Sequence, residues 1–272
     1  MERLMNIDRR LIWGLLFVAL SIPLIKPLGL PLSIGAQTQT VYDYVEALPS
    51  GSKIFLSMDT DPSAQGEIGP GSIALFNHLA KKGMKVYAVG FNPGGPNFFE
   101  ALAQQSLLAG KEYGTDWVNL GYLAGGQAAL SAMAKDIPGA YPNDFRGNPT
   151  ASLPIMEGLV DVKGIALAIS VTSSDGFRWW IQQVGDPYGV PLATMCNMVD
   201  APQIMPLVQS KQLLGVIAGL RGGAEYEKLV QVLGLGSAGM DAQSVAHMLV
   251  LVLVALGNIG HLLSKPAKGA KS

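Results

Sequence analysis

The chain has 272 residues, of which 49% are hydrophobic and 14% charged, and its net charge at pH 7 is −1. Soluble domains typically carry about 25% charged residues. The near-neutral charge gives no electrostatic footprint for nucleic acid, so a nucleic-acid partner is not expected. The mean hydropathy is +0.30, and the apolar residues concentrate near the two ends of the chain. This distribution predicts membrane segments that flank a globular middle.

The first segment, residues 1–36, predicts an N-terminal membrane anchor. Residues 11–25 are apolar and uncharged, which is short of the roughly 20 residues that a spanning helix needs. Lys26 can extend the usable length by snorkelling. A cleaved signal peptide with a cleavage site near Ala36 is the alternative, because a basic stretch precedes the apolar one. The basic residues are Arg3, Arg9 and Arg10.

The last segment, residues 241–272, predicts a transmembrane helix followed by a basic tail. Residues 244–263 contain no acid, lysine or arginine and match the length of a bilayer span. A buried core helix is the alternative. Small residues let helices approach closely, and polar side chains in lipid face a partner, so this helix is expected to contact other membrane subunits or a second copy. The residues concerned are Ala246, Gly257, Asn258, Gly260 and His261.

Basic residues flank both apolar segments, and those that follow the second one are Lys265, Lys268 and Lys271. The positive-inside rule then places both termini in the cytoplasm. Two spans with this orientation put the middle of the chain outside the cytoplasm, at the cytoplasmic membrane of a prokaryote-like cell.

The middle, residues 37–240, predicts one α/β domain. Short apolar stretches alternate with amphipathic ones, which is typical of parallel βαβ units. Continuous apolar strands fit a sheet that is covered on both faces. Strands are expected over residues 54–58, 85–91, 117–120, 164–171, 191–197 and 213–218. Helices are expected over residues 41–48, 72–82, 97–110, 127–135, 177–184, 201–210 and 224–233.

These elements predict a doubly wound, mostly parallel, six-stranded Rossmann-like sheet. The halves, residues 41–136 and 155–236, are joined by a long loop over residues 137–154. Two three-stranded lobes resembling a periplasmic binding protein are the alternative. The loop itself offers a candidate contact surface. Its members are Tyr141, Asp144, Phe145 and Arg146.

Polar and glycine residues follow the predicted strands. In open parallel sheets, ligands bind outside the carboxyl ends of the strands, so a ligand-binding rim is expected there. The candidate residues are Asp59, Asp61, Asn92, Gly94, Gly126, Ser173, Ser174, Asp200, Arg221 and Gly222. Arg221-Gly222-Gly223 is expected to be a loop that binds an anion through its backbone amides and guanidinium. Ser173 and Ser174 are expected either to cap the next helix or to bind a ligand at its N-terminus.

Asp59-x-Asp61 is the sharpest pattern on the rim. Two carboxylates just past a strand can hold Mg²⁺, or divide into a nucleophile and an acid. The catalytic candidates are Asp59, Asp61 and Asp175. The strand with its two aspartates superficially resembles the first motif of haloacid-dehalogenase-like phosphatases. Pro62 departs from that motif, however, and no downstream lysine and paired-aspartate motif is clear. The alternative is a turn in which both aspartates cap loop amides, with no cofactor.

Two longer phrases, KEYGTDWVNLGYLAGG at residues 111–126 and DIPGAYPNDFRG at residues 136–147, resemble an uncharacterised family of membrane-anchored α/β proteins. The resemblance implies no activity, substrate or site residue. The sequence therefore favours a membrane-anchored, non-catalytic binding or assembly subunit of a membrane complex. An extracytoplasmic hydrolase or transferase that uses Asp59 and Asp61 is the first alternative, and a tethered solute-binding receptor is the second.

Overall fold

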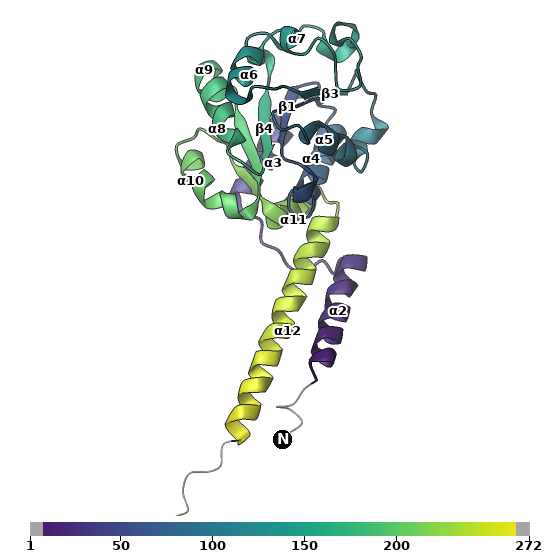
Figure 1. Ribbon diagram of the computed structural model, residues 1–272, viewed down its shortest axis with the longest axis vertical. Coiled ribbons are helices and arrows are strands. Elements are labelled where there is room, and N and C mark those ends of the chain that lie inside the picture. The colour runs from purple at the N-terminus through teal and green to yellow at the C-terminus, as the bar shows by residue number, and fades with distance from the viewer. Residues whose placement is uncertain (1–7, 265–272) are drawn as a thin grey trace, which may run out of the picture. The chain divides into compact units, whose positions relative to one another are not determined.

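The structure is a computed structural model that describes residues 8–264 and divides the chain into two compact units (Figure 1). One unit comprises the described parts of Met1–Pro31 and Ser237–Ser272, and the other is Leu32–Gly236. Four of the basic residues used above to orient the chain lie outside the described residues. They are Arg3, Lys265, Lys268 and Lys271.

The second unit is built on one six-stranded sheet in which every pair of neighbouring strands is parallel. The strands are β1 (Lys53–Asp59), β2 (Lys85–Gly90), β3 (Trp117–Tyr122), β4 (Leu167–Thr172), β5 (Leu192–Cys196) and β6 (Val216–Ala218). Their order in the sheet is β3-β2-β1-β4-β5-β6. The prediction of a single sheet is confirmed, and the two-lobe alternative is wrong.

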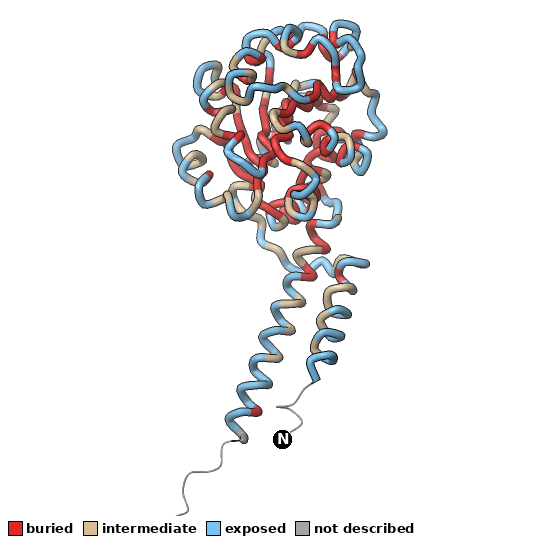
Figure 2. The backbone as a smooth tube through the Cα atoms, in the orientation of Figure 1, coloured by how far each residue is buried: buried red, intermediate tan, exposed pale blue. Residues whose placement is uncertain are grey.

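Helices cover both faces of this sheet. They are α3 (Ala36–Ala47), α4 (Gly69–Lys81), α5 (Gly95–Ala103), α6 (Gly126–Met133), α7 (Ile137–Ala140), α8 (Gly176–Trp180), α9 (Asp186–Tyr188), α10 (Ala201–Gln209) and α11 (Gly219–Leu229). A first core layer packs α3, α4, α5 and α11 against the sheet. A second core layer packs α6, α7, α8 and α10 against the opposite face. Figure 2 shows the buried positions concentrated in the strands and in the helix faces turned toward them.

Short single turns complete this unit. The 3₁₀ turns are η1 (Pro62–Ala64), η2 (Leu107–Gly110), η3 (Thr150–Ser152), η4 (Pro154–Met156), η5 (Val162–Gly164) and η7 (Met198–Asp200). A π-helical turn, η6 (Ile181–Gly185), continues α8. Three of the 3₁₀ turns and α7 lie between β3 and β4, so the predicted long loop is ordered by local turns.

Strand β1 shows how the sequence sets the two faces of the sheet. Side chains alternate along a strand, and Ile54, Leu56 and Met58 belong to the first core layer. Phe55 belongs to the second layer. Asp59 lies four residues after Phe55 and ends the strand. Its carboxylate is therefore on the same face as Phe55, the second face of the sheet.

The C-terminal part of this unit departs from the sequence prediction in two places. Helix α11 begins at Gly219, so residues 221–223 lie in its first turns rather than in a loop. The glycines there allow close packing, because a Cβ on Gly223 would stand 2.8 Å from the backbone nitrogen of Gly71 in α4. The C-terminal helix, expected over residues 244–263, begins earlier, at Leu235.

The other unit contains α2 (Arg9–Ile25) and most of α12 (Leu235–Ser264). The stretch Leu235–Leu262 is long and apolar enough to cross a membrane, which agrees with the C-terminal prediction. Helix α2 has 17 residues and reaches about 26 Å at 1.5 Å per residue, against about 30 Å of hydrocarbon. The prediction of an N-terminal transmembrane helix is therefore wrong: the helix forms, but it is too short to span.

Asp241 joins the two parts of this unit. Its buried carboxylate accepts three backbone N–H groups, from Leu28 at 2.7 Å, Gly29 at 2.9 Å and Leu30 at 3.0 Å. Three amides pointing at one carboxylate form a charge-assisted cluster that is stronger than neutral hydrogen bonds. The segment after α2 is thereby fastened to the first turns of α12.

Candidate functional site

The order of the strands reverses between β1 and β4, which are neighbours in the sheet although two strands separate them in the sequence. In open parallel sheets, ligands bind at the carboxyl ends of the strands beside such a reversal. We call the segments that follow the carboxyl ends of the six strands the strand-end rim. At its centre stand the residues that follow β1 and β4, namely 60–61 and 173–175.

Asp59, the last residue of β1, is 4% exposed. It accepts a hydrogen bond from the Ser57 hydroxyl at 2.5 Å and another from the Phe91 backbone N–H at 2.8 Å. Burial raises its pKa to about 6, although both hydrogen bonds act in the opposite direction. The carboxylate is thus kept in the interior at a cost in solvation that its two donors do not fully offset.

Asp61 has a different environment. It is partly exposed, and its Oδ1 accepts the Ser63 N–H at 2.8 Å, which caps the turn η1. This bonding to Ser63 lowers the pKa of Asp61. Asp59 faces the second core layer while Asp61 serves a loop amide, so the two carboxylates have separate partners. This is the arrangement that the turn alternative describes.

The loop after β2 lies against the loop after β1. Asn92 Oδ1 accepts the Gly94 N–H at 2.8 Å, which forms a turn closed by the asparagine side chain. A Cβ on Gly94 would stand 2.9 Å from the Cβ of Asp61. The predicted residues Asp61, Asn92 and Gly94 are therefore brought together on the rim.

The loop after β4 joins the same place. The Ser173 hydroxyl lies 2.9 Å from the hydroxyl of Thr60, which connects the ends of β1 and β4 directly. The backbone N–H of Ser174 donates to the Thr172 hydroxyl at 3.0 Å. Asp175 receives the Arg178 Nε–H at 3.3 Å at an exposed position. Ser173, Ser174 and Asp175 are all exposed.

Gly126 follows β3 and lies against the helix that follows β4. Its φ is +55°, and a Cβ there would stand 3.1 Å from the ring of Trp179. The neighbouring side chains of Gln127 and Gln182 are hydrogen bonded at 2.8 Å. The loop after β3 thus rests on the helix that follows β4, and only glycine fits this left-handed conformation easily.

Asp200, Arg221 and Gly222 follow β5 and β6, toward the edge of the sheet. Asp200 accepts the Gln203 amide at 3.2 Å. Arg221 donates to Glu225 at 2.9 Å, within α11. The prediction that Arg221-Gly222-Gly223 form a loop is therefore wrong, because these residues are helical. Anion binding there stays a prediction, and the guanidinium already has a carboxylate partner.

A pocket of about 280 Å³ does lie at this edge, and it holds both Arg221 and Gly222. The other residues that line it are Gly35, Gln37, Thr38, Met198, Ala201, Met205, Val216, Ala218 and Glu225. Most of these side chains are apolar, and the Glu225 carboxylate is bonded to Thr38 at 2.7 Å as well as to Arg221. The pocket is separated from Asp59 by strands β4 and β5.

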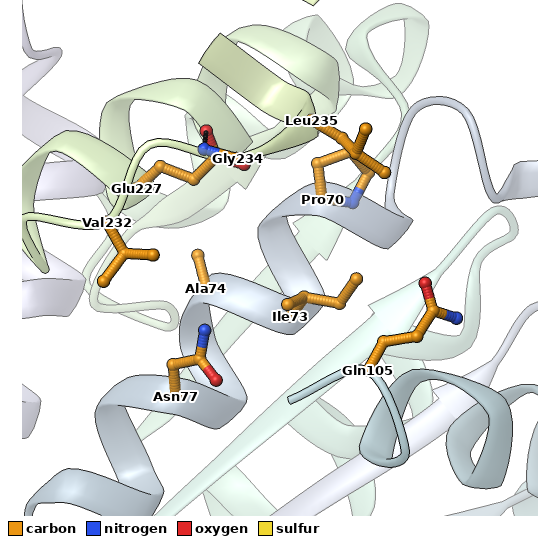
Figure 3. Close-up of a pocket in the computed structure, with 9 residues that line it drawn as sticks. All are labelled: Pro70, Ile73, Ala74, Asn77, Gln105, Glu227, Val232, Gly234 and Leu235. Atoms are coloured by element: carbon orange, nitrogen blue, oxygen red, sulfur yellow. Dashed lines mark hydrogen bonds between the residues drawn. The ribbon is translucent and has the colours of Figure 1, made fainter. Parts of the chain in front are cut away.

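A second pocket, of about 200 Å³, lies between α4 and residues 227–235 (Figure 3). Pro70, Ile73 and Ala74 of α4 form one wall, as the close-up shows. Glu227 is bonded to the backbone N–H groups of Gly234 and Gly236, at 3.0 and 2.8 Å. Its carboxylate therefore orders the chain where α12 begins.

The sequence prediction missed three polar side chains on the second face of the sheet. Tyr141, Ser170 and Trp180 are each at most 3% exposed, and their polar atoms have no hydrogen-bond partner among the described residues. Tyr141 was assigned to a contact surface because aromatic loop residues favour interfaces. Of that predicted surface, Tyr141 and Asp144 are buried, and Phe145 and Arg146 are exposed.

Asp144 holds its own loop together by hydrogen bonds and is not part of an exposed contact surface. Its carboxylate accepts the backbone N–H of Arg146 at 2.9 Å and of Asn148 at 2.7 Å, and the Tyr113 hydroxyl at 2.8 Å. The Arg146 guanidinium lies 3.6 Å from the Tyr113 ring centroid. A sequence signal existed here, since an aspartate before glycine and asparagine is a turn pattern.

Within residues 8–264, no group of three or more His, Cys, Asp or Glu side chains is placed to hold a metal ion. Burial raises the pKa of the Cys196 thiol to about 12, so this cysteine is not a thiolate nucleophile at neutral pH. Comparisons with protein-family models, with curated proteins and with solved structures find no match to this chain.

Proposed function

We propose that this protein is a membrane-anchored binding subunit of a membrane complex. In this proposal α12 crosses the bilayer, and the basic residues that follow it in the sequence mark its cytoplasmic side. The α/β unit, which we infer to be Rossmann-like from its strand order, then offers its strand-end rim outside the cytoplasm. The inference that both termini are cytoplasmic no longer applies, because α2 does not cross. No catalytic role is assigned to Asp59 or Asp61, because their contacts are separate and local.

The surface of α12 carries the proposal. Large apolar side chains are exposed along most of its length. They include Met248, Val250, Leu251, Val252, Val254, Leu256, Ile259 and Leu262. A helix that is apolar on all sides needs lipid or protein around it. Burial of this surface is favourable by about 25 cal/mol per Å² of apolar area, which supports insertion into a bilayer.

The Asp241 contacts extend the proposal to α2. Because Leu28, Gly29 and Leu30 are bonded to α12, the chain leaves α2 beside the first turns of α12. Exposed Trp13 and Phe17 give α2 an apolar surface of its own. We therefore place α2 in the same apolar layer, as a partner that enters the membrane without crossing it.

Membrane partners are proposed to contact the C-terminal half of α12. Gly257 and Asn258 are exposed there, and a Cβ on Gly257 would meet nothing within 4 Å. Small and polar residues of this kind permit close helix contacts and hydrogen bonds across a helix pair. Ala246, which is half-buried, and His261, which is exposed, extend the proposed contact surface, whereas Gly260 is buried.

Carbonate extraction of membranes tests the anchor. The natural chain should stay in the membrane pellet, and Val252→Arg, which puts a charge in the middle of α12 at a cost of about 2.5–3.5 kcal/mol, should raise the fraction found in the supernatant. Val232→Arg is the matched control, since Val232 is exposed but precedes α12, and it should remain in the pellet. Release of the natural chain by carbonate would contradict the proposal.

Purification in mild detergent tests the assembly. The chain should elute with a stoichiometric partner or as an oligomer, and Gly257→Leu should weaken that association. A single 28.7 kDa chain in its micelle, with no partner at any detergent concentration, would show that the protein is not a subunit even if the anchor is correct.

A further inference from the structure

A set of buried polar groups lies on the second face of the sheet, directly below the centre of the strand-end rim. Asp59 is 4% exposed, Tyr141 and Ser170 are each 3% exposed, and Trp180 is 2% exposed. The polar atoms of the last three have no hydrogen-bond partner among the described residues. Buried polar atoms are nearly always bonded in folded proteins, so three together require an explanation.

The contacts around Asp59 bring these groups to one place. Ser170 of β4 is in register with Ser57 of β1, and the Ser57 hydroxyl donates to Asp59. Tyr141 belongs to the same buried core layer as Phe55 and Trp180, and its hydroxyl has no hydrogen-bond partner among the described residues. The Asp59 charge also contributes to the raised pKa of Tyr141.

Helix α8 brings the fourth group. Its first residue, Gly176, lies against Asp59, since a Cβ there would be 3.1 Å from Asp59 Oδ2. Trp180 follows one turn later, and one turn places residues on the same side of a helix. The Trp180 ring packs against Phe55 and Phe91, with centroids 6.5 and 6.4 Å away. Phe91 is the residue whose backbone N–H donates to Asp59.

Asp59 and the other three side chains have different hydrogen-bonding roles. Trp180 Nε1–H is a donor only, and the hydroxyls of Tyr141 and Ser170 can donate or accept. An ionised Asp59 only accepts, and its two known donors leave lone pairs unused. Its donors are the Ser57 hydroxyl and the Phe91 backbone N–H, and neither is a cation. A neutral or amine-bearing molecule with both a donor and an acceptor matches this arrangement.

We propose that Asp59, Tyr141, Ser170 and Trp180 form a closed binding site for one small molecule that donates a hydrogen bond to Asp59 and accepts one from Trp180 Nε1–H. The hydroxyls of Tyr141 and Ser170, which can donate or accept, are its other partners. Ordered water and a small amine or alcohol solute share this chemistry. The site belongs to the interior of the α/β unit, and it does not depend on the membrane role proposed above.

Thermal unfolding of the full chain in detergent tests the site, because the proposal predicts whether Tyr141→Phe lowers or raises the Tm. If a molecule binds, Tyr141→Phe removes one of its hydrogen-bond partners and lowers the Tm by about 2–4 °C. If nothing binds, the same substitution removes an unsatisfied buried hydroxyl and raises the Tm, which would overturn the proposal. Ser170→Ala should show the same sign and serves where the tyrosine variant does not fold.

Tyr87→Phe is the matched control. Tyr87 is buried in the same core layer, and its hydroxyl donates to the Ile155 carbonyl, so its loss must lower the Tm whatever occupies the site. Tyr141 and Ser170 share no direct hydrogen bond, so a shared molecule makes the effects of their substitutions non-additive. Additive effects in the double variant would overturn a common occupant.

The source of the bound molecule is identified separately. Mass spectrometry of the supernatant from denatured protein should show a solute at about one per chain if the occupant is an amine or alcohol. Without a released solute, a high-resolution crystal structure should show a water peak between Asp59 and Tyr141. A crystal structure with no density there would overturn the proposal.

Discussion

Asp59→Asn is the substitution that tests the electrostatic description of the rim most directly. The asparagine has the same shape as the aspartate, and its carbonyl can still accept the Phe91 N–H, which now bonds the carboxylate at 2.8 Å. Its amide group meets the Ser57 hydroxyl, which can rotate to accept instead of donate. The variant therefore removes the charge and keeps the packing.

The magnitude follows from the shift in pKa. Burial raises the pKa of Asp59 from 3.8 to about 6, which is a shift of about 2 units at about 1.4 kcal/mol each. An ionised Asp59 therefore lowers the free energy of unfolding by about 3 kcal/mol relative to an uncharged side chain in the same place.

The sign follows from proton binding. Between pH 3.8 and about pH 6 the folded state holds the proton more tightly than the unfolded state, so the Asp59 contribution to stability is present at low pH and is lost as pH rises through 6. The Asp59→Asn variant lacks this pH-dependent contribution, because its side chain does not titrate in this range. It should unfold at the same urea concentration as the natural protein near pH 4 and at a higher one at pH 8.

Urea unfolding of both proteins, followed by tryptophan fluorescence at pH 4, 5, 6, 7 and 8, measures this difference. Subtracting the two curves at each pH removes contributions from other titrating groups. Parallel curves, or a variant that is less stable at pH 8, would refute the argument that Asp59 is buried with incomplete compensation. A confirmed gain would mean that the natural carboxylate is retained at a cost to the stability of the fold.

Three further substitutions test other parts of the structure. Burial lowers the pKa of His78, so the neutral imidazole stabilises the folded state above about pH 6.5, and this stabilisation is lost on acidification. His78→Gln should remove that loss when urea unfolding is compared between pH 7 and 5. An unchanged dependence of the unfolding free energy on pH would contradict this prediction. Asp241→Ala should speed hydrogen exchange at the amides of residues 28–30, measured by mass spectrometry, because it removes their shared acceptor. Gly95→Ala should lower the unfolding free energy by about 1–3 kcal/mol, because its Cβ would lie 1.9 Å from the Met58 carbonyl oxygen. An unchanged Tm would show that Gly95 does not pack tightly against Met58.

The fold was accessible from the sequence because its signals are local. The apolar stretch that begins at Ile54 is bounded by Ser52 and Asp59, and such runs become strands wherever both faces are covered. The absence of Asp, Glu, Lys and Arg from residues 244–263 likewise predicts an apolar helix there, and α12 contains that stretch within Leu235–Ser264. Residues 221–223 show the limit, since glycines that look like a loop are helical where they pack against Gly71.

The candidate site was only partly accessible. That Asp59 and Asp61 follow one strand could be predicted, but whether they form a pair depends on where the backbone turns after β1. Burial of Tyr141 depends on how a long connection folds back over the sheet, and its neighbours in sequence carry no apolar period that would reveal it.

The sequence by itself determined which segments are strands, that the C-terminal apolar helix is long enough for a membrane, and that polar residues gather at the strand ends, because each depends on side-chain pattern along a few residues. It did not determine where α2 ends, and so predicted a second span that the described residues do not contain. Tertiary structure decided the order of the strands and the contacts that cross it. Only those contacts put the Asp59 carboxylate among unpartnered hydroxyls, gave Asp61 to a loop amide, and fastened residues 28–30 to α12 through Asp241. Such interactions join residues far apart in the chain, and no local pattern records which of them will meet.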